Sequence, residues 1–131
     1  MMDTPQFEVG RSYTRREIYD ILGGDLVSNF PSHQGQVLYC CVSQYWNPDA
    51  PEIILIDRQE RMTQNAKHFV SQSEPIPVFV KQGRRKNSEL VYRGMFLAER
   101  YSTDRDEIHP LARKAYRSDI VVVLFLRQVS Q

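Results

Sequence analysis

A basic loop inside a predicted β-hairpin is the stretch of the sequence best equipped for chemistry. Strand-forming residues flank residues 83–88 (GRRKNS) on both sides, within residues 76–101. From position 81 to position 100, six Lys and Arg residues stand against two Glu, a local charge of +4 in a chain whose total is +1. Such a loop could bind phosphate groups through Arg84, Arg85 and Lys86. A solvated hairpin tip has the same composition, so charge alone leaves both interpretations open.

Two adjacent aromatic residues, Tyr45 and Trp46, follow a predicted strand and precede a turn-rich stretch. Aromatic side chains beside a basic surface can stack on a nucleic-acid base or line a pocket for an extruded base. An aromatic pair next to a strand can also close the edge of a hydrophobic core. A second basic spot lies further along the chain and comprises Arg113, Lys114 and Arg117.

Residues typical of catalysis or metal binding occur without the necessary spacing. His33, His68 and His109 are scattered, and the adjacent Cys40 and Cys41 do not form half of a zinc site. The sequence has no Gly-rich phosphate loop, no G-x-S-x-G motif and no acidic-x-Lys pair of the nuclease type. We therefore expect no catalysis, no metal and no cofactor.

The cysteines and the apolar runs predict the environment of the protein. Adjacent residues in a strand point to opposite faces, so Cys40 and Cys41 cannot readily pair with each other. This favours a reduced, cytosolic setting. The N-terminus shows no signal-peptide pattern, and the longest apolar run, residues 120–126, is too short to span a bilayer.

The sequence of 131 residues is of single-domain length and predicts two or three short helices. The first, over residues 15–22, begins at a capping box formed by Thr14 and Glu17 and ends at a Gly-Gly pair. The second is predicted over 64–71 with Thr63 as its cap. The third is predicted over 110–116, with proline in its first turn.

Short apolar runs predict five or six strands. Residues 36–43 form a nearly continuous apolar run, which favours a central strand. The remaining strands are predicted at residues 7–9, 52–56, both arms of the hairpin and 119–129. Hairpins combined with short helices predict an α+β fold: a small, strongly bent mixed β-sheet or open β-barrel with two or three helices.

Four segments together resemble a known group of domains. They are FEVGRSYTRREIYDILGG at 7–24, M-T-x-N-A-x-H at 62–68, PVFV at 77–80 and VYRG-x-F at 91–96. Their order resembles the SRA-like domains of the PUA superfamily that are attached to HNH restriction endonucleases and recognise modified DNA; this group includes the sulfur-binding domains. The resemblance covers roughly residues 7–101 and implies a PUA/SRA-like fold. By the same resemblance, the DNA-contacting residues are Tyr13, Arg15, Arg16, Asn65, His68 and Arg93.

The leading hypothesis is a nucleic-acid-binding module that reads modified double-stranded DNA, through a modified base or a phosphorothioate backbone. The resemblance implies binding without cleavage, because no HNH nuclease motif is present, and an effector nuclease or regulator would act on the bound site. One alternative is a PUA-type RNA-binding domain that uses the same basic hairpin. The other is a protein-interaction module, favoured by the near-neutral total charge and the acidic stretch at 104–107.

Overall fold

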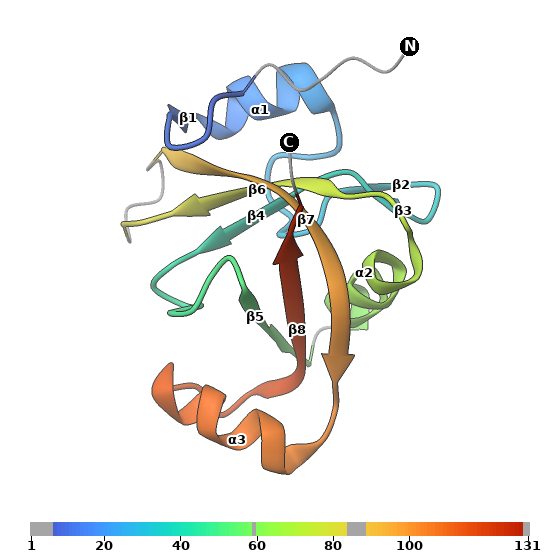
Figure 1. Ribbon diagram of the computed structural model, residues 1–131, viewed down its shortest axis with the longest axis vertical. Helices are drawn as coiled ribbons and strands as arrows, with labels where there is room; N and C mark the ends of the chain where they lie inside the picture. Colours follow the sequence, from blue (N-terminus) through green and yellow to red (C-terminus); the bar gives the residue numbers. More distant parts are fainter. Residues whose placement is uncertain (1–6, 59, 84–88, 130–131) are drawn as a thin grey trace.

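A strongly bent, mixed β-sheet forms the centre of the protein (Figure 1). The computed structural model describes residues 7–58, 60–83 and 89–129. Within these residues the helices are α1 (Arg15–Leu22), α2 (Glu60–Ser71) and α3 (Arg105–Lys114). The strands are β1 (Ser12–Tyr13), β2 (Ser32–His33), β3 (Gln36–Val37), β4 (Cys40–Ser43), β5 (Ile53–Asp57), β6 (Ile76–Lys81), β7 (Leu90–Ser102) and β8 (Ile120–Gln128).

The main sheet has the strand order β4-β6-β7-β8-β5, with β1 added beside β7. Strands β4 and β6 are parallel, and the other pairs are antiparallel. The 13-residue strand β7 pairs with β6 through its first half and with β8 through its second half. Register shifts interrupt both pairings, as expected where a strand bends. The predicted hairpin and the predicted bent mixed sheet are therefore confirmed.

The prediction of a central strand over residues 36–43 is wrong. The segment is divided into β3 and β4, and β4 stands at one end of the main strand order. Its apolar sequence reflects burial on both faces. Cys40 belongs to the inner core with Val78 and Leu124, whereas Cys41 belongs to a second cluster with Tyr39 and Phe79. The two thiols are free and point to opposite faces, as predicted.

Helix α1 begins as its sequence predicts. The Thr14 hydroxyl accepts from the Glu17 amide at 3.1 Å, and the Glu17 carboxylate accepts from the Thr14 amide at 2.8 Å. Ile18 is completely buried and anchors the helix on the sheet. Residues 7–9, predicted as a strand, form none; the first strand is β1.

The starts of the other two helices were predicted too late in the chain. Helix α2 begins at residue 60 rather than 64, so Thr63 lies inside it. Helix α3 begins at Arg105, capped by Asp104, whose carboxylate accepts from the Asp106 amide at 3.0 Å. The acidic residues at 104–107 thus stabilise the positive end of a helix dipole, and Pro110 lies inside the helix.

An ion pair attaches the first turn of α3 to strand β7. The Arg100 guanidinium donates to both carboxylate oxygens of Glu107. Hydrogen bonds from Arg100 and Ser102 lower the pKa of Glu107 from 4.5 to about 2. This pairing therefore contributes stability above about pH 4.5, and the contribution is lost as the pH falls through about 2.

The carboxyl carbon of Glu107 is expected to titrate with a midpoint near 2 in an NMR pH titration. Arg100→Gln should return the midpoint toward 4.5, because the charged donor is lost. Arg127→Gln removes a different β-strand arginine, which pairs with Glu99, and should leave the Glu107 midpoint unchanged. An unchanged midpoint in Arg100→Gln would show that Arg100 does not hold the carboxylate.

No helix among residues 7–58, 60–83 and 89–129 is long and apolar enough to cross a membrane. In the same ranges no cluster of three or more His, Cys, Asp or Glu side chains has the geometry of a metal site.

Candidate functional site

A pocket of about 470 Å³ lies where the end of β4, the strand β5, the start of α2 and the α3–β8 connection meet. We call it the aromatic pocket, because Trp46 and Tyr116 line it. Its volume falls within the range of about 300–1,000 Å³ that is usual for small-ligand sites. The full set of lining residues is Asn29, Ser43, Trp46, Asn47, Leu55, Asp57, Met62, Tyr116, Arg117, Ser118 and Asp119.

The two aromatic side chains of the pocket are exposed rather than packed in the core. Trp46 is 54% exposed and Tyr116 is 97% exposed. Tyr45, also exposed, packs edge-on against Trp46, with ring centroids 4.8 Å apart. Tyr116 adopts a φ of 57°, a region that bulky residues avoid. The pair Tyr45–Trp46 therefore does not close a core edge, and two aromatic faces remain available for stacking.

Arg117 fixes the position of Trp46. Its guanidinium lies 5.8 Å from the centroid of the Trp46 ring, and Nη1 donates to the Trp46 carbonyl at 3.1 Å. On the other side its Nε lies 3.5 Å from the Asp119 carboxylate. The Arg117 side chain is only 12% exposed, so it holds a defined orientation between the indole and the carboxylate. Trp46 is thereby oriented before any ligand arrives.

The remaining walls of the pocket combine polar and apolar groups. Asn47 is buried and its amide is committed to the fold, donating to the Ser43 carbonyl at 3.2 Å and accepting from the Leu55 amide at 2.8 Å. The carboxylates of Asp57 and Asp119 can accept hydrogen bonds. Leu55 and Met62 supply apolar surface. The pocket can thus stack a planar ring, accept hydrogen bonds from its amino groups and contact a small apolar substituent.

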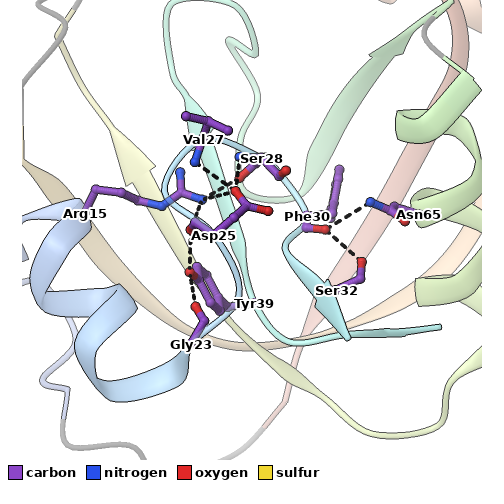
Figure 2. A network of polar contacts seen from close by, with 9 residues as sticks. All are labelled: Arg15, Gly23, Asp25, Val27, Ser28, Phe30, Ser32, Tyr39 and Asn65. Carbon is purple, nitrogen blue, oxygen red and sulfur yellow. Dashed lines mark hydrogen bonds and ion pairs between the residues drawn. The ribbon is translucent and has the colours of Figure 1, made fainter. Parts of the chain in front are cut away.

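The loop at residues 23–31 brings Asn29 to the pocket and is held from both sides (Figure 2). From α1, Arg15 donates through Nη2 to the carbonyls of Asp25 at 3.1 Å and Ser28 at 2.7 Å. From α2, Asn65 donates to the Phe30 carbonyl at 3.1 Å. The backbone is therefore fixed immediately before and immediately after Asn29.

Tyr39 adds a third anchor to this loop. Burial raises the pKa of Tyr39 to about 12, so the hydroxyl keeps its proton. That proton is shared between the carbonyls of Gly23, at 2.8 Å, and Asp25, at 3.1 Å, as Figure 2 shows. The Asp25 carboxylate accepts in turn from the amides of Val27 and Ser28. The loop is a fixed part of the structure on the side facing α1.

Three of the residues that the sequence predicted to contact nucleic acid bind backbone groups of other segments through their side chains. Arg15 and Asn65 hold the loop just described, and the hydroxyl of the buried Tyr13 accepts from the Glu8 amide at 2.8 Å. These contacts give the three residues positioning roles. Direct contact of Tyr13, Arg15 or Asn65 with a ligand stays a prediction.

The other nominated residues are distributed over several elements. Arg16 is 70% exposed on α1 and pairs with Asp20, His68 is exposed on α2, and Arg93 is half-buried on β7. Of the nominated residues that the structure describes, only Trp46 lines the aromatic pocket, and Tyr45 packs against it. The nominated loop residues Arg84, Arg85 and Lys86 lie outside the residues that the structure describes.

Sequence reasoning missed several residues of the pocket, above all Tyr116. In sequence this tyrosine follows an amphipathic helix and resembles an ordinary helix end. Its exposure and positive φ appear only in the folded chain. Trp46 and Arg117 contact each other across 71 positions, a separation that no local pattern encodes.

Replacing Arg15 with methionine is expected to lower the free energy of unfolding by about 2 kcal/mol, because two backbone carbonyls lose a charged donor. Urea unfolding measures the change. Arg16→Met is the matched control: this neighbouring arginine is exposed and contacts only the nearby Asp20 and the Tyr19 ring of its own helix, so the cost should stay within about 0.5 kcal/mol. Equal losses in the two variants would contradict the assigned role of Arg15.

The fold is that of solved SRA domains. A crystal structure of the SUVH5 SRA domain with hemimethylated CG DNA matches 98% of this chain and 93% of that chain, with a TM-score of 0.65 and 20% identity. The SUVH5 SRA domain bound to fully hydroxymethylated CG DNA matches 100% of this chain and 95% of that chain, with a TM-score of 0.61 and 19% identity.

A structure of KRYPTONITE in complex with mCHG DNA and SAH gives a TM-score of 0.68 at 12% identity. That match covers 98% of this chain and 33% of the other. No protein-family model matches the sequence, and no curated protein matches it. The matches to solved structures show that the described residues adopt the fold of an SRA domain, as the sequence resemblance implied.

Proposed function

We propose that this protein reads modified duplex DNA by taking one modified nucleotide out of the helix and holding its base in the aromatic pocket. The observation that carries the proposal is the pair of exposed aromatic side chains, Trp46 and Tyr116, at one hollow. Proteins that inspect or modify a base extrude it and stack it against aromatic or apolar side chains. The fold supports the same function, because the structures it matches are complexes with methylated DNA.

The polar groups of the pocket favour a base with an exocyclic amino group. Asp57 and Asp119 present carboxylates at the pocket, and a carboxylate accepts well from the amino group of cytosine. Thymine has a carbonyl oxygen at that position and would be repelled. Leu55 and Met62 supply the apolar contact that a methyl substituent requires. A modified cytosine therefore suits this pocket better than a modified phosphate does.

The loop beside the pocket presents an apolar tip that suits the same reaction. Val27 is 84% exposed, yet its backbone amide is held by the Asp25 carboxylate at 2.8 Å. Only Ser28 separates it from Asn29 in the pocket wall. Proteins that distort duplex DNA frequently insert apolar side chains between base steps. In our proposal Val27 fills the space in the base stack that the extruded base has left.

A fluorescence anisotropy titration at low salt tests the proposal. One duplex is prepared in unmodified, cytosine-methylated, hydroxymethylated and phosphorothioate forms, together with the matched single strand and the matched RNA. The proposal expects tighter binding to one base-modified duplex than to the unmodified duplex. Equal binding to every form would mean that the protein binds phosphate groups without reading a modification. Preference for RNA would favour the PUA-type alternative.

The proposal includes binding and no chemical step by this chain. An effector nuclease or regulator that acts on the bound site remains a prediction from the sequence resemblance. The basic loop residues Arg84, Arg85 and Lys86 keep their predicted role as phosphate contacts that set the register of the protein on the duplex.

A further inference from the structure

A second hollow, of about 550 Å³, lies between α3 and the start of β8. We call it the arginine groove, because Arg58, Arg105, Arg113 and Arg117 line it. Its lining also includes the apolar side chains of Ile108 and Ile120. On α3, Arg105, His109 and Arg113 are spaced by four residues, so they follow one side of the helix.

The groove carries positive charge that the rest of the described protein does not neutralise. None of its lining residues is acidic. In residues 7–58, 60–83 and 89–129, the side chains of Arg58, Arg105 and Arg113 form no hydrogen bond or ion pair, whereas Arg117 pairs with Asp119. Near the start of α3, Asp104 caps the helix and Glu107 pairs with Arg100, and Asp106 is not among the residues that line the groove. Unneutralised arginines around a concave surface attract an anionic ligand.

The groove adjoins the aromatic pocket. Arg117 and Ser118 line both hollows, so one short piece of backbone separates them. If one nucleotide of a DNA strand entered the aromatic pocket, the neighbouring nucleotides would lie at the mouth of the groove. A lining that combines arginines with apolar side chains suits a chain of phosphates and sugars, with arginines at the phosphates and Ile108 and Ile120 at the deoxyriboses.

We propose that the arginine groove holds the sugar–phosphate backbone of the DNA strand whose modified nucleotide occupies the aromatic pocket. This inference rests on the proposed function. Arg105 and Arg113 contact phosphates beside the extruded nucleotide, and Arg117 lies between the two sites, oriented by Trp46 and Asp119. The groove contributes affinity and holds the strand, whereas the aromatic pocket supplies the preference for the modification.

The test measures duplex affinity across a range of salt concentrations for Arg105→Gln, Arg113→Gln and the double variant. Each lost phosphate contact should weaken binding roughly 5- to 10-fold near 0.1 M salt and reduce the slope of log K against log salt by about 0.9. Modified and unmodified duplexes should lose affinity by the same factor, so the ratio between them should not change.

Arg127→Gln is the matched control. It removes the same charge at the other end of β8, which runs from α3 toward the opposite end of the molecule in Figure 1. Arg127 is 58% exposed and has one ion pair, with Glu99, so its loss should not perturb the fold. The control is expected to retain the wild-type affinity and salt slope.

A double-mutant cycle locates the contact. Single phosphates on either side of the modified nucleotide are replaced by neutral methylphosphonates, one at a time. If Arg113 contacts one of them, removing that phosphate and Arg113 together should cost less than the two separate losses combined. The same cycle with Arg127→Gln should show additive losses at every position.

The outcomes separate the two proposals. A wild-type protein with no preference for any modified duplex would refute the proposed function. If the wild-type protein prefers one modified duplex, but the groove variants keep the affinity and the salt slope of the Arg127→Gln control, only the groove assignment is refuted. Binding of poly-glutamate that is lost in the groove variants, with duplex binding unchanged, would assign the groove to an acidic protein and overturn the inference.

Discussion

Replacement of Trp46 with alanine is expected to weaken binding of the preferred modified duplex roughly 5- to 150-fold, because stacking of a base on an aromatic side chain contributes about 1–3 kcal/mol. Tyr116→Ala should have an effect in the same range, since both rings line one pocket. Binding of the unmodified duplex should change much less, so the preference for the modification should largely disappear. Parallel anisotropy titrations of the two duplexes measure this ratio.

Two variants control for loss of an aromatic residue as such. Tyr101→Ala removes an aromatic ring that is 39% exposed on β7 and does not line the pocket, and it should leave the preference intact. Trp46→Phe keeps an aromatic face and should restore most of the affinity. If Trp46→Ala and Tyr101→Ala behave alike, stacking in the pocket is not the source of recognition.

Replacement of Phe79 with alanine is expected to lower the free energy of unfolding by about 3–5 kcal/mol. Phe79 on β6 is completely buried. Its ring centroid lies 5.0 Å from that of Phe7, 5.2 Å from that of Tyr92 and 6.3 Å from that of Tyr39. Truncation would leave a cavity among rings that cannot all move to fill it. Urea unfolding followed by circular dichroism measures the loss.

Ile21→Ala provides the comparison for Phe79. Ile21 is an apolar residue of α1 that is 51% exposed, so its truncation should cost less than about 1 kcal/mol. The Phe79 cluster also contains Ile18 of α1, the helix that carries Arg15. A loss in Phe79→Ala no larger than that in Ile21→Ala would mean that this cluster is not what holds α1 against the sheet.

Features encoded within a few residues were predicted well from the sequence. The capping box of Thr14 and Glu17 acts over three positions, and both of its hydrogen bonds are formed. The hairpin was also predicted, because two strand-like segments flank a short polar loop. The bent mixed sheet and the SRA-like fold followed from these elements and from the resemblance.

Features that depend on distant contacts were not predicted. Burial of both faces of β4 gave it the composition of a central strand, although it ends the strand order. The start of α3 was missed because Asp104 was interpreted as part of an acidic loop rather than as a helix cap. The aromatic pocket was missed as a unit because Trp46 and Tyr116 come together only through the packing of α3 beside the β4–β5 connection.

The direct test of the account uses the fluorescence of Trp46. Trp46 is the single tryptophan of the chain, so its emission reports on the aromatic pocket alone. We expect saturable quenching on titration with the preferred modified duplex, as the extruded base stacks on the indole, and little change with the unmodified duplex. Binding that is evident by anisotropy but leaves the Trp46 emission unchanged would contradict the account, because the modified base would then be recognised elsewhere.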